Sequence, residues 1–316
     1  MSIRIYTFVG YYRKQILVFK KHSVSSYHYI DILVNAVLAI IMFGLGLSFT
    51  WQDFKQTLFQ PKPLITGLSI QIFIIPLIAG IIAAVSGLSP EEQVGIVLVS
   101  TCASGASSNL ITHLVRGNVP LAVSMTTINS FITLISLPLI VSFAMFVFLG
   151  DKTRISLPVA TTIAQIFLVA IVPAAAGVFV RNLSTRFADN MEKPLKFVLP
   201  ILLFAVFAFK IFAEKNQGGS GLSFDDGMAI FPFVLLLNVL AMLAGYLISR
   251  MAGLTFQNQF TIAIEVGLHN TALALLVAGT ILHSPEMEKP ALVYAMFTFF
   301  SAFIFIYFVK RGKTFN

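Results

Sequence analysis

The sequence is poor in charged residues and nearly lacks cysteine and tryptophan. Only 11% of its 316 residues are charged, where a soluble domain carries roughly 25%, so a soluble globular protein is excluded. The single cysteine excludes an internal disulfide and a zinc site built from several cysteines. What the chain has instead is apolar side chains: 57% of residues are hydrophobic, 31 are Phe, and the mean hydropathy is +0.90. The bilayer is therefore the relevant solvent.

Nine predominantly apolar segments are long enough to cross a bilayer, which takes about 20 helical residues. Because lipid offers the backbone no hydrogen bonds, runs of this length are predicted to be helices and not barrel strands. The fold class is therefore an all-α polytopic membrane protein with about nine transmembrane helices. The predicted spans are 30–49, 64–85, 93–115, 121–149, 157–180, 194–212, 228–248, 260–282 and 291–309.

Lys and Arg are distributed unequally between the two sides of this arrangement. Alternate loops and the C-terminal end hold Lys55, Lys62, Arg116, Arg181, Arg186, Lys193, Lys196, Arg250, Lys310, Arg311 and Lys313, whereas the opposite loops hold Lys152, Arg154, Lys215 and Lys289. The first set has eleven basic residues and the second has four, so the positive-inside rule places the first set in the cytoplasm, together with the tail 313–316. Topology thus explains the net charge of +8, and no nucleic-acid partner is expected.

The basic segment 1–27 goes against this count, because nine spans with a cytoplasmic tail place its Lys and Arg outside. It has no apolar core like that of a signal peptide. Phe8, Tyr12 and Phe19 follow near-helical spacing, which predicts an interfacial helix with its apolar side toward lipid. An atypical extra span is the alternative.

Glu265 is the one carboxylate predicted to lie deep inside a span. A charged group is costly there and usually functional. No Lys or Arg lies within several residues, so the expected partner is a cation from solution, and sodium as a hard ion prefers oxygen ligands. Neutralisation by a proton or by a neighbouring helix is the alternative. Other polar residues at membrane depth are Gln71, Ser107, Ser108, Asn109, Thr126, Thr127 and Asn129.

Two spans are interrupted by glycine and small polar residues. The interruptions fall at 100–109 in the third span and at 265–271 in the eighth. Broken helices at corresponding positions of two halves are typical of a transporter binding site. In contrast, lone Cys102 is predicted to pack in the core, and the GLGL run at 44–47 to form a helix contact.

Two sequence stretches resemble the signatures of the bile acid:sodium symporter family. They are CASGASSNLITHLVRG at 102–117, followed by NVPLAVSMTT, and EVGLHN at 265–270. The resemblance extends over nearly everything from Ile30 to the end. It implies a single transporter domain at 28–312 with ten helices in two inverted repeats, the first helix being missing or degraded in 1–27. It also implies a panel at about 28–52 and 155–214, and a core at about 62–150 and 226–310 where two broken helices cross.

The resemblance further implies two sodium ions and a substrate site beside the crossing. The first ion would be held by Ser108, Asn109, Thr126 and Glu265. The second would be held by Gln71, Glu265, the carbonyls of Val266 and Leu268, and the position of His269. The substrate would contact Ala106, Ser107, Asn109, Asn270 and Thr298.

Several positions depart from the family pattern. Ala122 replaces a serine of the first sodium site, and His269 replaces a glutamine of the second. Imidazole is a poor sodium ligand, but it exchanges a proton near neutral pH. Phe297, Thr298 and Phe299 replace a Trp-His-Asn motif of the last helix, which makes the substrate wall more apolar.

The sequence therefore predicts a sodium-coupled transporter of a small organic anion in a bacterial inner membrane, with no obligate protein partner. Proton coupling through Glu265 and His269 is the alternative. An enzyme is not expected, because the chain has no H-E-x-x-H motif and Asp225 and Asp226 fall in a predicted exterior loop. A passive channel would not need the oxygen ligands of a broken helix. The identity of the anion stays open, since one fold serves many substrates.

Overall fold

The fold was analysed in a computed structural model, which describes residues 36–37, 39–44, 46–47, 61–150, 164, 167–213 and 219–313. Every element in these ranges is helical, and three of them are π-helices (η) with wider turns. The elements are α4 (Pro61–Ser69), η1 (Ile70–Ile74), α5 (Ile75–Val85), α6 (Pro90–Thr101), α7 (Ala106–Leu114), α8 (Val119–Leu149), η3 (Phe167–Ile171), α10 (Val172–Leu183), α11 (Thr185–Phe212), α12 (Phe224–Met251), α13 (Phe256–Gly267), α14 (Thr271–Leu275), η5 (Leu276–Ile281) and α15 (Pro285–Lys313).

Four of the described helices are long and apolar enough to cross a membrane. They are Pro61–Val85, Val119–Leu149, Phe224–Met251 and Pro285–Arg311, and shorter apolar helices lie at Phe167–Leu183, Ile201–Phe212 and Thr271–Ile281. The polytopic helical class is thus confirmed. The count of nine spans stays a prediction, because the first span is only partly described and segment 1–27 and residues 314–316 lie outside the described residues.

Large apolar side chains cover much of the outer surface of these helices. Phe73, Phe143 and Phe300 are each about two-thirds exposed. Exposed apolar surface on this scale marks a face that contacts something other than water. In a chain of this composition, that face is the lipid-facing surface.

Several helices begin with a side-chain cap. Ser89 accepts a hydrogen bond from the N–H of Glu92, whose carboxylate accepts the N–H of Ser89 in return, so α6 starts with a capping box. The same arrangement links Ser223 and Asp226 at the start of α12. Asp225 and Asp226 thus lie in the first turn of α12 and not in a loop as predicted, while their position on the exterior side stays a prediction.

Two helix starts also differ from the sequence prediction. The predicted span 194–212 is the second part of α11, which starts at Thr185 after a single connecting residue, Ser184. Ser184 caps that helix by accepting the N–H of Phe187 at 3.3 Å. The helix thus continues beyond its apolar stretch, because backbone hydrogen bonding does not stop where hydrophobicity does. Likewise, α15 starts at Pro285 and not at 291.

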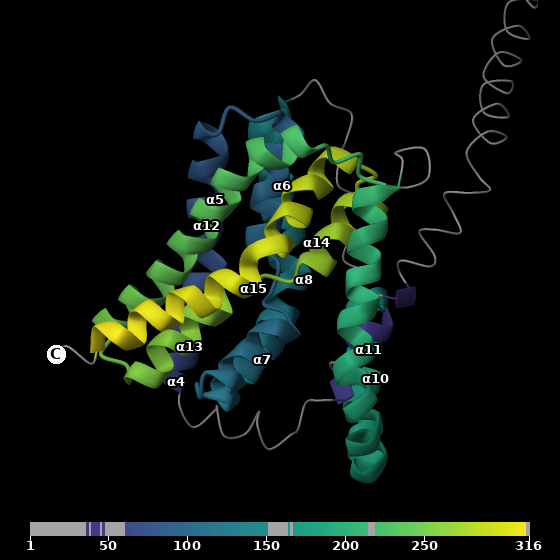
Figure 1. The fold of residues 1–316 in the computed structure, drawn as a ribbon, viewed down its shortest axis with the longest axis vertical. Helices are drawn as coiled ribbons and strands as arrows, with labels where there is room; N and C mark the ends of the chain where they lie inside the picture. Colours follow the sequence, from purple (N-terminus) through teal and green to yellow (C-terminus); the bar gives the residue numbers. More distant parts are fainter. Residues whose placement is uncertain are drawn as a thin grey trace, which may run out of the picture.

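The helices α10 and α11 stand side by side at one edge of the molecule, next to the described part of 36–47 (Figure 1). The backbones approach closely there: a β-carbon added to Gly46 would lie 2.0 Å from the carbonyl oxygen of Ala174, and one added to Gly177 would lie 2.2 Å from that of Phe43. The predicted helix contact of the GLGL run is thereby confirmed. The division into panel and core stays a prediction.

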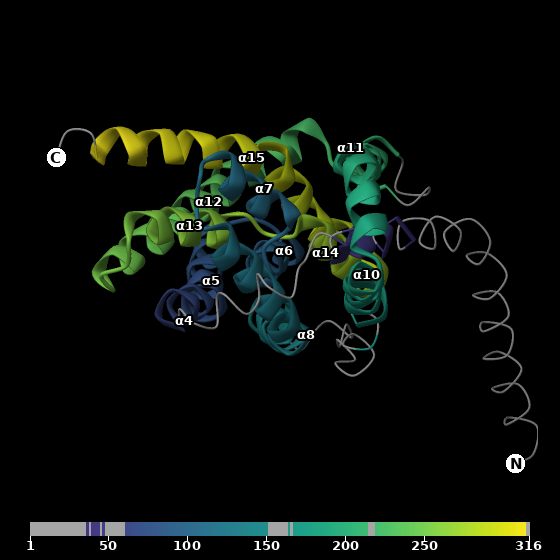
Figure 2. The ribbon, with the colours of Figure 1, turned by 90° about the horizontal axis from the view of Figure 1, so that it is seen from below.

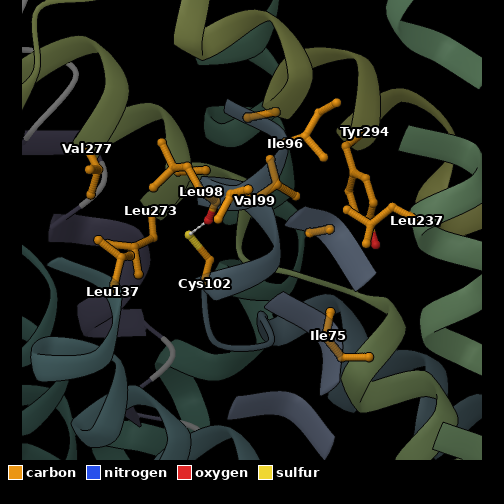
Figure 3. Packing of buried hydrophobic residues seen from close by; sticks show 14 of the residues in the cluster. Ile75, Ile96, Leu98, Val99, Cys102, Leu137, Leu237, Leu273, Val277 and Tyr294 are labelled. Atoms are coloured by element: carbon orange, nitrogen blue, oxygen red, sulfur yellow. Dashed lines mark hydrogen bonds between the residues drawn. The ribbon is translucent and has the colours of Figure 1, made fainter. Parts of the chain in front are cut away.

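The other helices enclose an apolar core around the end of α6. Cys102 is fully buried there, and its thiol donates to the carbonyl of Leu98 at 3.3 Å (Figure 3). Figure 3 also shows Ile75, Ile96 and Tyr294 in the same cluster. The packing role predicted for Cys102 is confirmed. Seen from below, α6 and α14 lie in the interior of the helix assembly (Figure 2).

Candidate ion and substrate site at the crossing of two broken helices

The two interrupted spans are both broken helices, and their breaks meet. The first break separates α6 from α7 and the second separates α13 from α14. Between them, Ser104 and His269 form an isolated antiparallel bridge, and the N–H of Asn270 donates to the carbonyl of Ala103 at 2.7 Å. Two extended segments, whose bridged residues Ser104 and His269 are 165 positions apart in the chain, thus cross inside the protein and hydrogen-bond to each other.

The carboxylate of Glu265 lies at this crossing and is only half satisfied. Its Oε2 accepts hydrogen bonds from Ser104 Oγ at 2.5 Å and from Thr126 Oγ1 at 2.9 Å. Its Oε1 is buried and has no hydrogen-bond partner, and no Lys or Arg pairs with the carboxylate anywhere in the described residues. A buried, unpartnered carboxylate oxygen is costly. This oxygen therefore marks a place for a cation.

Two of the other residues predicted for the first sodium ion, Thr126 and Ser108, lie near the same carboxylate. Thr126 contacts it directly from α8, and the hydroxyl of Ser108 lies within its reach from the first turn of α7. Ser108 also donates to the carbonyl of Gly105 at 2.7 Å. Asn109, one residue further along α7, has a buried Oδ1 without a hydrogen-bond partner among the described residues.

Ser104 is a site residue that the sequence prediction missed. Its hydroxyl lies 3.0 Å from Thr126 Oγ1, so Ser104, Thr126 and Glu265 form one cluster. Ser104 lies in the extended segment before α7. Its hydroxyl is therefore not engaged in a hydrogen bond to a helix carbonyl and can contact the carboxylate. Its position beside Gly105 in a polar interruption was the available signal.

Of the residues predicted for the second sodium ion, Gln71 and His269 are brought together. Gln71 lies in the wide turn η1, and its Nε2 is 3.3 Å from His269 Nδ1 and 3.4 Å from the carbonyl of Cys102. His269 Nδ1 lies 3.2 Å from that same carbonyl, while its buried Nε2 has no partner in the described part of the chain. Val266 and Leu268, the residues before and after Gly267 at the end of α13, are both buried. The imidazole thus occupies the position where the resemblance implies an amide.

The wide turn at Gln71 has a local cause. Pro76 has no N–H, so the carbonyl four residues earlier loses its helical partner. A π-turn directly before a proline redistributes the backbone hydrogen bonds and is frequent at functional sites. It places Gln71 opposite the first break.

The predicted substrate residues are grouped only in part. Ser107 is exposed in the first turn of α7, whose N-cap Gly105 provides no side-chain cap. A β-carbon added to Gly105 would lie 3.8 Å from the Cα of Asn270, and Asn270 caps α14 by accepting the N–H of Leu273 at 3.0 Å. Ala106 begins α7 at this point.

Thr298 stands apart from this group. It lies on α15, one turn beyond Tyr294, whose ring is 5.5 Å from that of His269. Phe297 extends this aromatic line, with its ring 5.6 Å from that of Tyr294. No hydrogen bond joins the Thr298 side chain to Asn109 or Asn270 within the described ranges.

The chain is similar to known membrane transporters. The sequence profile of the sodium bile acid symporter family matches residues 35–219, more than half of the chain. The chain is 28% identical over 272 residues to the sodium-dependent transporter YocS of Bacillus subtilis, covering 86% of this chain and 81% of that protein. It is 26% identical over 290 residues to the human ileal sodium/bile acid cotransporter, covering 89% and 79%.

A third relative is a probable sodium/metabolite cotransporter, BASS1, from the chloroplast of Arabidopsis thaliana. It is 29% identical over 256 residues, which are 81% of this chain and 61%, less than two-thirds, of the relative. The chain belongs to the sodium bile acid symporter family. It is therefore an integral membrane transporter and not an enzyme, and sodium is the coupling ion of its family.

Proposed function

We propose that this member of the sodium bile acid symporter family imports a small organic anion together with sodium, by alternating access across the bacterial inner membrane. The observation that carries the proposal is Glu265 Oε1, a buried carboxylate oxygen with no hydrogen-bond partner at the crossing of two broken helices. Sodium prefers such hard oxygen ligands. Its first site would use Glu265, Thr126, Ser108 and Asn109, with Ser104 added from the geometry.

The origin of these ligands supports coupling. They come from the first break, from α7, from α8 and from α13, so an ion held by all of them stabilises one arrangement of both broken helices. A ligand shifts a conformational equilibrium only by its difference in affinity between the two states. Sodium that binds the ordered crossing best would therefore raise the affinity for a substrate that needs the same arrangement, and the reverse would also hold.

The substrate side of the proposal rests on the uncapped start of α7. The N–H groups at a helix N-terminus favour a negative charge, and Ala106, Ser107 and Asn270 lie around this one. A carboxylate or sulfonate fits this chemistry.

A second sodium ion would lie between Gln71, Glu265, the carbonyls of Val266 and Leu268, and His269. The four oxygen-bearing groups support such a site, and the imidazole weakens it. The C-terminus would be cytoplasmic. In support, Lys310 Nζ donates to the carbonyl of Val115 beside Arg116, so two members of the larger basic set lie at the same end of the molecule. Segments 28–52 and 155–214 would form the panel against which the core moves.

Replacing Glu265 with Gln tests the proposal. The full-length protein is purified in detergent, and its thermal unfolding is followed while NaCl replaces KCl at constant ionic strength. Binding to the folded state raises apparent stability by mass action, by about 2.7 kcal/mol at a hundred times the dissociation constant. We expect sodium to stabilise the wild type and to have no such effect on Glu265→Gln.

Glu92→Gln is the matched control. Glu92 is also a buried carboxylate, but it caps α6 together with Ser89, and a glutamine serves a capping box as well. This variant should keep the sodium response. A normal sodium response in Glu265→Gln would refute the site. Stabilisation by small carboxylates that is independent of sodium but varies with pH would favour proton coupling instead.

A further inference from the structure

A buried hydrogen-bond network holds the end of α13 from behind the crossing. The carbonyl of Gly267, the last residue of α13, accepts hydrogen bonds from Asn238 Nδ2 at 2.7 Å and from the Tyr294 hydroxyl at 2.5 Å. Asn238 Nδ2 is also 3.1 Å from that hydroxyl, and Ser301 Oγ donates to Asn238 Oδ1 at 2.6 Å. The network thus ties α12 and α15 to the point where α13 unwinds.

The network is isolated from water. Asn238 and Tyr294 are both fully buried, and Figure 3 shows Tyr294 within the apolar cluster next to Leu237 of α12. Water therefore cannot replace a lost donor at the Gly267 carbonyl. Removing either donor leaves this buried carbonyl with a single hydrogen bond and so weakens the restraint on the segment.

Its position in the sequence gives the network a functional consequence. Gly267 lies two residues after Glu265 and two residues before His269. The carbonyl of Ile264 accepts the N–H of Leu268 at 3.0 Å. The Val266 carbonyl therefore lies in the chain between two hydrogen-bonded carbonyls, those of Ile264 and Gly267. The ring of Tyr294 also contacts that of His269. One side chain thus contacts both the end of α13 and the extended segment that follows it.

We propose that Asn238 and Tyr294 are positioning residues of the ion site: through the Gly267 carbonyl they fix the end of α13 and thereby set the affinity for sodium. The inference rests on the proposed function, because it concerns the same ion site. Neither side chain coordinates the ion. They hold the backbone on which Glu265 and the Val266 carbonyl are placed.

Tyr294→Phe tests this, since it keeps the ring and removes only the hydroxyl. The same titration of the full-length protein with NaCl against KCl gives the half-saturating sodium concentration. One hydrogen bond is worth a factor of about three to ten, so we expect that concentration to rise by this factor. A purely structural role would lower the unfolding temperature equally in both salts and leave the half-saturating concentration unchanged, which would overturn the proposal.

Two further variants keep the test decisive. Tyr246→Phe, where the ring packs edge-on against Phe305 at 6.3 Å, should titrate like the wild type. Ser301→Ala removes the donor to Asn238 and should shift the titration in the same direction by a smaller factor. If Tyr294→Phe does not fold, an unchanged half-saturating concentration in Ser301→Ala overturns the inference.

The outcomes separate the inference from the proposed function. A wild type without a sodium response, or a sodium response that survives in Glu265→Gln, removes the function and with it the inference. If those two proteins behave as expected while Tyr294→Phe titrates like the wild type, only the positioning role is lost.

Discussion

At the scale of single residues, the two oxygens of Glu265 have different surroundings. Oε2 is fixed by two hydroxyl donors, whereas Oε1 is left without a partner. Because Ser104 and Thr126 hold one oxygen in place, the direction of the other is fixed before an ion arrives. A preorganised ligand loses less conformational freedom on binding and therefore binds more tightly.

Removing one of these donors should weaken ion binding without abolishing it. In Ser104→Ala, Oε2 keeps Thr126 but loses its shorter hydrogen bond, and Oε1 is less firmly directed. A hydrogen bond to a charged group contributes about 1.5–3 kcal/mol, so we expect the half-saturating sodium concentration in thermal unfolding to rise about tenfold or more. Ser100→Ala is the control, because Ser100 donates to Val97 within its own helix. Identical sodium titrations of the two variants would contradict this role for Ser104.

At the scale of helices and their breaks, the two interruptions were predictable and their details were not. A glycine among small polar residues inside an apolar run is unfavourable for a continuous helix in lipid, and this signal at 100–109 and 265–271 led to both breaks. Single sequence positions do not reveal which side chains meet. Ser104 was therefore missed, and the contact between Gln71 and His269 came from resemblance alone.

Helix boundaries were less predictable for a different reason. Arg186, Asp189 and Lys193 look like a loop by hydropathy, yet they lie in α11. Polar residues of this kind support a helix that leaves the membrane, since charged side chains with long stems are good helix formers. Hydropathy thus locates the membrane-embedded part of a helix and not its end. The wide turn at Gln71 likewise follows from backbone hydrogen bonding and has no hydropathy signal.

The close contact of α10 with the helix at 36–47 depends on glycine. In Gly177→Ala the new methyl group would lie 2.2 Å from the Phe43 carbonyl oxygen, so the backbones must separate, which typically costs about 1–3 kcal/mol. Gly80→Ala is the matched control on α5, because a β-carbon there meets nothing within 4 Å. It should be neutral or stabilising by up to about 1 kcal/mol. Thermal unfolding should show a loss of stability in Gly177→Ala only; a Gly177→Ala variant as stable as Gly80→Ala would show that glycine is not required for this contact.

At the scale of the whole molecule, a buried ion pair joins the edge helices to the rest. Lys210 of α11 lies 2.7 Å from Glu288 of α15, and both are more than 90% buried. A side chain at Gly279 in η5 would collide with this pair. Ser220 donates to the carbonyl of Lys210 with both its N–H and its hydroxyl, at 2.8 and 2.9 Å. Charge, and not only apolar packing, thus connects α11 to α15.

A second ion pair nearby lies closer to water. Lys289 is itself buried and pairs with Asp226 at 2.8 Å and with Glu286, but these two carboxylates are about one-third exposed. Solvent can therefore screen the carboxylates when the lysine is removed, and pairs with such access to water are usually worth less than about 1 kcal/mol. The two neighbouring lysines of this end of the molecule are therefore expected to differ strongly in their effect on stability.

Removing the charge of Lys210 should be far more harmful than removing that of Lys289. In Lys210→Met, Glu288 keeps a buried charge without its ammonium partner, and breaking such a pair typically costs about 3–5 kcal/mol. Lys289→Met should cost about 1 kcal/mol or less. Adding Glu288→Gln to Lys210→Met removes the uncompensated charge and should restore most of the lost stability, because a buried pair contributes little net stability compared with neutral groups of similar volume. Thermal unfolding of the wild type, Lys210→Met, Lys289→Met and the double variant measures these differences in stability. A double variant no more stable than Lys210→Met would mean that the two side chains act independently and that apolar packing alone holds α11 against α15.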